Sequence, residues 1–175
     1  YAIRTCLDGA ARHLQDVFPN VRLEILPLSE RSPRLLANGE VDLVLSGQSF
    51  DIGVPSNTCL LEDQFVCIAC SKMGPPGKNL LPREFAYSEH VVVRYFDQQM
   101  TFEDEDALRK AGVVRTRRIT TWSHTHVASL VCGTSMLATV PARIADDFSR
   151  RWPIKILPFP FSHEPIRVFA YWHPS

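Results

Sequence analysis

The densest group of chemically capable residues is Trp122-Ser123-His124-Thr125-His126, which combines an indole, two imidazoles and two hydroxyls. It joins a predicted strand, 117–122, to a predicted helix, 126–132, and ligands of open α/β sheets bind at such junctions. Trp122 and His124 are suited to stacking on an aromatic ligand. Ser123 is equally suited to capping the helix, and the two roles are compatible. We therefore predict that residues 122–125 contact a ligand.

Neither the histidines nor the acidic run of this chain predicts a metal site. His124 and His126 are two residues apart, so they do not share a helix face, and His126 is expected to pack as an ordinary helix residue. The run Glu103-Asp104-Glu105-Asp106 is typical of the first turn of a helix, where carboxylates favour the helix dipole. We expect no metal ion and no cofactor.

The five cysteines, at positions 6, 59, 67, 70 and 132, are odd in number and lack the spacing of a disulfide framework. Cys67 and Cys70 have redox-motif spacing, but they lie in the apolar run FVCIAC, which predicts a strand. Residues three apart on a strand point to opposite faces, and no helix follows to activate a thiolate. We predict buried structural thiols and a reducing, cytoplasmic location. Cys132, at the end of an apolar helix, is poorly placed to be a nucleophile.

The remaining candidate ligand-binding residues lie at the ends of predicted elements, and each has a structural alternative. Ser29 and Gly47 are also typical turn residues. His90 begins a buried strand, where a structural histidine is the commoner case. The face of strand 166–172 that meets a ligand is not decided by its alternation, which leaves Phe169 open. The full set of these candidates is Tyr1, Ser29, Gly47, His90, Arg94 and Phe169, with Arg94 also able to pair with Asp97.

The first third of the chain predicts a helix over 1–18 followed by a strand–helix–strand unit. Its parts are a strand over 21–26, a helix over 32–38 and a strand over 41–45. Ser32 is the expected N-cap, and Pro33 occupies the first helical position. Such a unit forms a right-handed crossover between parallel strands.

The rest of the chain continues to alternate strands with helices, which predicts an α/β fold. Residues 59–73 contain one long bent strand or two short ones, and 82–85 resembles a turn. The further predicted strands are 90–94, 117–122, 138–140, 154–158 and 166–172, and the further predicted helices are 102–111, 126–132 and 142–148.

Composition describes a globular chain without an excess of charge. The 175 residues include 45% hydrophobic and 22% charged residues, and 19 Lys plus Arg balance 19 Asp plus Glu. A domain that grips nucleic acid by itself normally has a basic surplus, so we expect no DNA binding by this chain alone. No apolar run is long enough to span a bilayer, and no membrane partner is expected.

Several segments together resemble the effector-binding domain of LysR-type transcriptional regulators. They are FPNVRLEILPL, LLANGEVDLVLSG, FVCIACSKM, EHVVVRYF, GTSMLATVPARIADDF and VFAYWH, in the family's order and spacing. The ATVPAR and YWH segments look most like the branch that senses aromatic or flavonoid-type inducers. That branch includes the NodD and NahR regulators and a toxoflavin-responsive regulator.

The resemblance implies a two-lobed fold like that of type 2 periplasmic binding proteins, with two crossing strands between the lobes. Lobe one is expected at 1–63 plus 166–175 and lobe two at 64–165, with FVCIAC and IRVFAYWH as crossing strands. The implied ligand is a small aromatic or heteroaromatic effector such as toxoflavin, bound in the cleft between the lobes. The family also places a hydrogen-bonding residue at the position of Ser29 and a histidine near the ligand at that of His90.

The resemblance further implies a regulator that self-associates as a dimer or tetramer, with the 1–18 helix as a candidate interface. Promoter DNA and RNA polymerase would be reached only through an N-terminal helix-turn-helix domain, which this sequence does not contain. The alternatives are a solute-binding protein of the same fold and, less favoured, an enzyme on it. No GxSxG, Walker or zinc-type motif supports the enzyme.

Overall fold

The computed structural model describes residues 3–47, 56–94 and 103–173. The chain divides into two compact units, and we treat each by itself. Unit 1 consists of Tyr1–Glu62 and Arg167–Ser175, and unit 2 of Asp63–Ile166. The lobes expected from the sequence are 1–63 plus 166–175 and 64–165, and that these units act as two lobes around a ligand stays a prediction.

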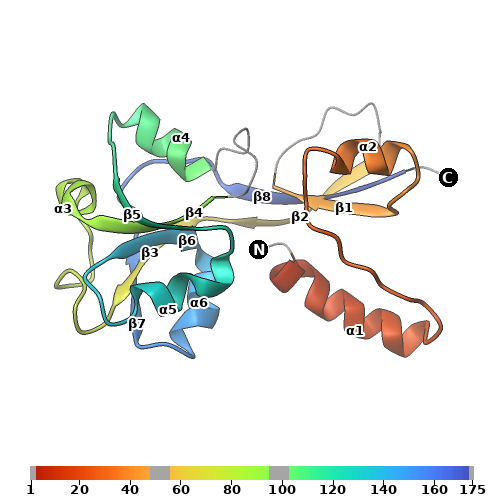
Figure 1. Ribbon diagram of the computed structural model, residues 1–175, viewed down its shortest axis with the longest axis horizontal. Coiled ribbons are helices and arrows are strands. Elements are labelled where there is room, and N and C mark those ends of the chain that lie inside the picture. Colours follow the sequence, from red (N-terminus) through yellow and green to blue (C-terminus); the bar gives the residue numbers. More distant parts are fainter. Residues whose placement is uncertain (1–2, 48–55, 95–102, 174–175) are drawn as a thin grey trace. The chain divides into compact units, whose positions relative to one another are not determined.

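Unit 1 contains two helices and a small sheet (Figure 1). A π-helical turn, Ile3–Leu7, leads into α1, Asp8–Val17, which confirms the predicted N-terminal helix. Helix α2 spans Ser32–Ala37. The sheet has the strand order β1-β8-β2, in which β1 is Leu43–Ser46, β2 is Ser56–Asp63 and β8 is Ile166–Trp172.

The predicted strand–helix–strand crossover in unit 1 is wrong. Residues 21–26 form no strand, and Val21, Leu23 and Ile25 are each about half exposed. Strand β1 instead pairs antiparallel with β8, from Leu43↔Trp172 to Ser46↔Phe169. An alternating apolar pattern indicates that a segment suits a sheet, but a strand also needs a neighbour to receive its backbone hydrogen bonds.

The start of α2 also differs from the prediction. Pro33 lies in its first turn, as expected, but Ser32 is the first helical residue and Arg31 holds the cap position. The Ser32 hydroxyl accepts a hydrogen bond from the Ser29 N–H at 3.0 Å, and the Ser29 hydroxyl accepts one from the Arg31 N–H at 3.3 Å. The two serines therefore close the turn that leads into the helix.

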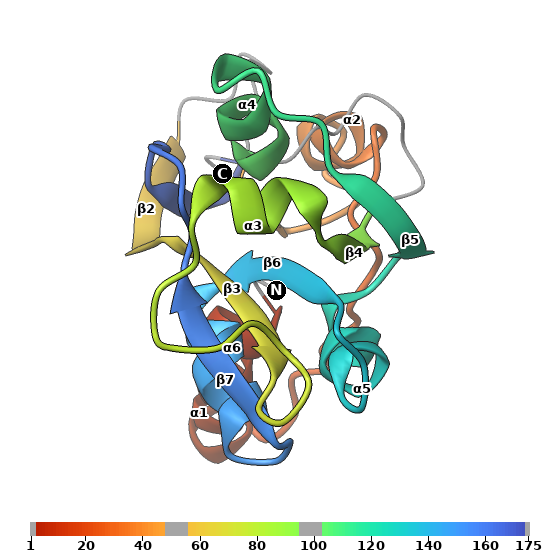
Figure 2. The ribbon, with the colours of Figure 1, turned by 90° about the vertical axis from the view of Figure 1, so that its left-hand side faces the viewer.

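Unit 2 is built on a five-stranded mixed sheet with the order β5-β4-β6-β3-β7 (Figure 2). The strands are β3, Phe65–Cys70; β4, Glu89–Val93; β5, Thr116–Thr121; β6, Leu137–Pro141; and β7, Ile154–Pro158. β4 pairs in parallel with both β5 and β6, whereas β3 pairs antiparallel with β6 and β7. β3, which was expected to cross between lobes, thus lies inside this sheet.

Helices cover both faces of this sheet. They are α3, Pro82–Tyr87; α4, Glu103–Lys110; the 3-10 turn η2, His124–His126, continued by α5, Val127–Val131; and α6, Ala142–Ser149. α3 and α4 lie on one face, and α5 and α6 on the other (Figure 2). The strands and helices predicted for 90–173 are confirmed, with ends shifted by one or two residues. The segment predicted as a turn at 82–85 is a short helix.

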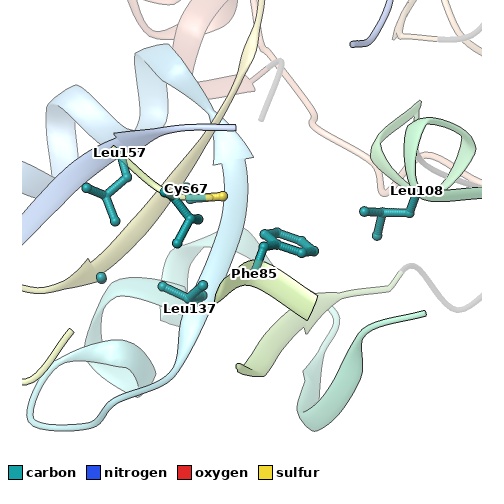
Figure 3. Close-up of a cluster of buried hydrophobic side chains, with 7 residues drawn as sticks. Cys67, Phe85, Leu108, Leu137 and Leu157 are labelled. Atoms are coloured by element: carbon teal, nitrogen blue, oxygen red, sulfur yellow. The ribbon is translucent and has the colours of Figure 1, made fainter. Parts of the chain in front are cut away.

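Alternate side chains of β3 contribute to the hydrophobic core under α3 and α4. Cys67 and Ala69 point to this face and pack with Leu137, Leu157, Leu80, Phe85 and Leu108. Figure 3 shows Phe85 from α3 and Leu108 from α4 directed at this cluster. All seven side chains are at most 5% exposed, and each large one contributes roughly 1.5–3 kcal/mol by its burial. This cluster fixes α3 and α4 on the sheet that positions the candidate site.

Candidate functional site

A small hollow in unit 2 lies where strands β4 and β5 end and η2 begins. Its lining consists of Phe65, Val92, Val93, Asp104, Arg115, His124 and Thr139. The enclosed volume is about 10 Å³, which is room for about one water molecule. A larger ligand would therefore have to lie across its mouth rather than inside it.

The parallel strands β4 and β5 bring the two sequence segments of the site together. Their register pairs Val93 with Thr121, and the Arg94 N–H continues the ladder by donating to the Thr121 carbonyl at 2.7 Å. Because both strands run in the same direction, the residues after Val93 and after Thr121 leave the same edge of the sheet. Arg94 and the 122–126 segment, both selected from the sequence as ligand-binding candidates, therefore leave the same edge of the sheet, and their contact with a ligand stays a prediction.

Ser123 fixes the turn into η2. Its hydroxyl accepts a hydrogen bond from the Thr125 N–H at 3.2 Å and contacts the Thr125 hydroxyl at 3.1 Å. The predicted capping role is thereby confirmed. The turn directs His124 inward, at 8% exposure, and leaves Trp122 and Thr125 exposed.

His124 is an uncharged wall of the hollow at neutral pH. Burial lowers the pKa of its imidazole from 6.5 to about 3, because the charged form loses solvation there. Trp122 presents an indole that is 59% exposed, and its ring centroid lies 6.2 Å from that of His126 in an edge arrangement. Trp122 is not among the lining residues of the hollow. The site therefore offers a neutral imidazole in the hollow and, two residues before it in the chain, an exposed aromatic surface, and both suit a planar, uncharged ring.

A buried ion-pair network forms the polar side of the hollow. The Arg115 guanidinium donates to Asp104 at 2.8 Å and to Glu105, whose other oxygen is 3.3 Å from Arg117. The side chains of Arg115 and Asp104 are only 3% and 7% exposed. Burial by itself lowers the pKa of Arg115, but the two carboxylates outweigh burial and raise it, so the guanidinium stays charged. Two carboxylates among the described residues already balance its single positive charge.

Thr139 contributes the one lining hydroxyl without a conventional partner among the described residues. The Thr139 Oγ1 is buried. Among the described residues, the one polar side chain in contact with it is the weak thiol of Cys67, its register partner on β3. Burial raises the pKa of Cys67 to about 12, and the Thr139 contact offsets this only in part. The hydroxyl is thus available to a ligand or a water molecule at the hollow.

His90 lies at the opposite end of β4 from the hollow and is not part of its lining. Its ring packs on Phe85 with centroids 4.3 Å apart, and its Nε2 lies 2.8 Å from the Phe85 carbonyl oxygen. Burial lowers its pKa to about 4. These contacts are those of a structural histidine that ties α3 to β4, the alternative left open by the sequence.

None of the other predicted residues that the structure describes belongs to the lining of the hollow. Ser29 and Gly47 are exposed and belong to unit 1, where Ser29 serves the α2 turn. Phe169 packs in a unit 1 cluster with Leu36, Val44 and Tyr171. Arg94 is exposed at the end of β4, and Tyr1 and Asp97 lie outside the described residues. Ligand contact by these positions stays a prediction.

Among the seven lining residues, sequence reasoning predicted only His124. It missed the other six, namely Phe65, Val92, Val93, Asp104, Arg115 and Thr139. Asp104 is hidden within a run of four acids, whose pattern predicts a solvated helix turn. Its partner Arg115 is 7% exposed, whereas the adjacent Val114 is 89% exposed. This reversal of the usual burial is a tertiary fact for which the sequence contains no signal.

Two further properties of the described residues concern metal binding and membrane crossing. Among the described residues, no group of three or more His, Cys, Asp or Glu side chains is arranged to hold a metal ion. Over the same residues, no helix is long and apolar enough to cross a membrane.

Curated relatives of the chain include nodulation proteins. It is 28% identical over 147 residues to Nodulation protein D 3 of Mesorhizobium japonicum, covering 81% of this chain and 47% of that protein. It is 29% identical over 146 residues to Nodulation protein D 1 of Sinorhizobium fredii, covering 81% and 44%. The chain thus spans about half the length of the curated relatives it matches.

Solved structures with the same fold include regulatory domains. The regulatory domain of MexT, a transcriptional activator in Pseudomonas aeruginosa, matches with a TM-score of 0.79 at 20% identity, covering 95% of this chain and 82% of that one. Full-length CbnR in complex with its target DNA matches with a TM-score of 0.76 at 13% identity, covering 100% and 62%. These similarities confirm the predicted α/β, two-lobed periplasmic-binding-protein-like fold class. The LysR substrate binding domain profile matches residues 2–175, and the chain belongs to that family of effector-binding domains of transcriptional regulators.

Proposed function

We propose that this chain senses a small planar aromatic or heteroaromatic molecule, of the size and type of toxoflavin or a flavonoid, at the β4–β5 edge of unit 2. In the whole regulator, binding there would alter DNA binding or transcription activation through a separate N-terminal domain. Self-association as a dimer or tetramer and contact with promoter DNA and RNA polymerase belong to that whole protein. The nodulation regulators among its relatives support a sensing role.

The observation that carries this proposal is the neutral imidazole of His124 in the lining of the hollow, with the exposed indole of Trp122 two residues before it at the end of two parallel strands. A planar ring could stack on Trp122 while one polar atom reaches the Thr139 hydroxyl across the mouth of the hollow. Because Asp104 and Glu105 already balance the charge of Arg115, we expect a neutral effector to be preferred to a carboxylate.

The test is a thermal unfolding series of the 175-residue chain with planar compounds that include toxoflavin and a flavonoid. A ligand that binds only the folded state raises Tm progressively with its concentration. We expect such a rise with neutral heteroaromatic compounds and a smaller one with benzoate-type acids. A flat response to all of these compounds would contradict the proposal.

Point variants locate the binding site. Trp122→Ala and His124→Ala are each expected to weaken binding about two- to tenfold, because an aromatic contact contributes roughly 0.5–1.5 kcal/mol. The matched controls are Trp152→Ala and His13→Ala, an indole and an imidazole that are exposed and do not line the hollow. Unchanged affinity in both test variants, with controls equal to them, would move the site elsewhere.

A further inference from the structure

Cys70 and Cys132 meet on the face of the unit 2 sheet opposite the Phe85 cluster. Cys70 is the last residue of β3, and its side chain points away from that of Cys67, as the strand alternation requires. Helix α5 packs against β3 on this face and ends at Val131, with Cys132 as its C-cap. The next residue, Gly133, donates its N–H to the Cys70 sulfur at 3.3 Å.

The Gly133 N–H brings a backbone hydrogen-bond donor to the Cys70 sulfur. The backbone N–H groups of Lys72 and Met73 and the thiol of Cys132 act on this sulfur in the same direction. Backbone N–H groups that converge on one point favour an anion. These groups hold the pKa of the Cys70 thiol below its ordinary value, whereas burial raises that of Cys67 to about 12. Both cysteines of FVCIAC are buried, as predicted, and the donors distinguish Cys70 from Cys67.

The backbone that supplies these donors is held in place on both sides. Gly74 donates its N–H to the Cys70 carbonyl at 2.9 Å, which closes the turn that carries Lys72 and Met73. A Cβ at Gly74 would lie 2.6 Å from the Cβ of Ala69 and 2.8 Å from the Cys70 oxygen, so only glycine fits there. Gly133 has a φ of +79°, a conformation that glycine adopts without strain.

The sulfur pair is near the surface of the unit. Cys70 is 4% exposed, but the residues that follow it, Ser71, Lys72 and Met73, are all exposed, and Cys132 is half-buried. A small oxidant would therefore reach the two sulfur atoms after only a small movement of these exposed residues. Cys59, by comparison, is exposed without such a donor set, and its thiol contacts only the Leu61 carbonyl at 3.5 Å.

We propose that Cys70 and Cys132 form an oxidisable thiol pair that reacts with peroxides and closes to a disulfide. The Cys70 thiolate attacks one peroxide oxygen, so that an S–O bond forms, the O–O bond breaks and the departing hydroxide takes up a proton as water. The Cys132 sulfur then attacks the sulfenic sulfur of Cys70. The S–S bond forms, the S–O bond breaks, and hydroxide leaves with the Cys132 proton as a second water molecule. Two thiols are oxidised, and one hydrogen peroxide is reduced to two waters.

The disulfide would join the end of β3 to the end of α5. Helix α5 continues directly from η2, which carries His124 in the effector hollow. The modification site is nevertheless independent of the proposed effector, because none of its donors lines that hollow.

The experiment treats the fully reduced 175-residue chain with one equivalent of hydrogen peroxide and maps the products by peptide mass spectrometry. We expect loss of two hydrogens per molecule in a single linked pair of peptides that contain Cys70 and Cys132. In Cys132→Ser, the reaction is expected to stop at a sulfenic acid on Cys70, which dimedone traps. In the matched control Cys59→Ser, the wild-type disulfide is expected to form at the wild-type rate.

A second measurement tests the thiolate without oxidation. The rate of alkylation of Cys70 by iodoacetamide, followed as a function of pH, is expected to rise at a lower pH in the folded chain than in urea. Oxidation confined to Cys59 or Cys6, or an alkylation profile for Cys70 that is the same in the folded and unfolded chain, would overturn the proposal. A disulfide that links Cys70 to any cysteine other than Cys132 would overturn the pairing.

Discussion

Arg115 shows how much one buried side chain contributes when it serves two acids. It neutralises Asp104, which is as buried as itself, and also holds Glu105, while its neighbour Val114 is exposed to solvent. An isolated buried carboxylate would be strongly unfavourable, so the arginine and Asp104 have to be considered together. Asp104 and Arg115 also line the hollow, so this side of the hollow is charged and held in place by the ion pair.

Removing one partner of this pair should cost more than removing both. We expect Arg115→Met to lower the free energy of unfolding by about 3–5 kcal/mol, because Asp104 is left buried without its cation. The double variant Asp104→Leu with Arg115→Met is expected to recover most of that loss. Denaturant unfolding followed by circular dichroism provides the measurement.

The matched control for this series is Arg118→Met. Arg118 is 67% exposed and 3.8 Å from Glu89, so its loss should change stability by less than about 1 kcal/mol. If Arg115→Met and Arg118→Met had equal effects, the buried network would have no special role in stability.

Two buried histidines should make the chain sensitive to mild acid. The pKa of His124 is lowered by burial to about 3 and that of His90 to about 4, against 6.5 for an ordinary histidine. Each therefore supports the folded state fully above about pH 6.5, and this support is lost as the pH falls toward 4. Between pH 7 and 5, each contributes a loss of up to about 2 kcal/mol in the free energy of unfolding.

Comparison of His124→Gln with His126→Gln isolates this effect. We expect the His124 variant to lose less stability than the wild type between pH 7 and 5, because one group that must take up a proton on unfolding is gone. The His126 variant, altered at an exposed position, should follow the wild-type curve. Parallel curves for all three proteins would show that His124 takes up no additional proton on unfolding.

At the scale of residues, the sequence predicted those roles that depend on neighbouring positions in the chain. The capping role of Ser123 follows from its place between a strand and a helix, and it is confirmed by its bond to Thr125. Thr139 could not be found in the same way, because it lies inside the apolar strand LATVP and only the packing of β3 against β6 shows what it faces.

At the scale of elements, the central strands β3 and β6 of unit 2 were predictable because they are almost entirely apolar. All six residues of β3 and all five of β6 are buried, as expected for strands covered by helices on both faces. The segment 21–26 has an equally strong alternation but forms no strand, since pairing depends on a partner that the segment itself does not encode. Periodicity predicted the elements well and their pairing poorly.

The close packing of Gly74 in the turn after β3 can be tested by substitution. Gly74→Ala should destabilise unit 2 by about 1–3 kcal/mol, because the new methyl group would overlap Ala69 and the Cys70 carbonyl. Gly9→Ala is the control, since that glycine lies in α1 with nothing near its Cβ position, and there alanine should be neutral or add up to about 1 kcal/mol. Thermal unfolding of both variants measures the difference. Equal stability of the Gly74 variant and the wild type would show that the turn adapts.

At the scale of the whole molecule, the balance of charge sets the expected behaviour toward DNA. With 19 basic and 19 acidic residues, the chain has no surplus with which to displace counterions from a duplex. We expect no change in the fluorescence anisotropy of a labelled duplex at an ionic strength of about 0.15 M, the physiological value. A salt-dependent rise in anisotropy at micromolar protein would contradict this expectation.

The two units differ in how the chain builds them. Unit 2 is one uninterrupted segment, Asp63–Ile166, whereas the middle strand of the unit 1 sheet, β8, comes from the far end of the chain. During synthesis on the ribosome, β1 and β2 therefore emerge long before the strand that lies between them. Unit 2 has all of its strands available first, and the sheet of unit 1 closes only after Ile166–Trp172 have been translated.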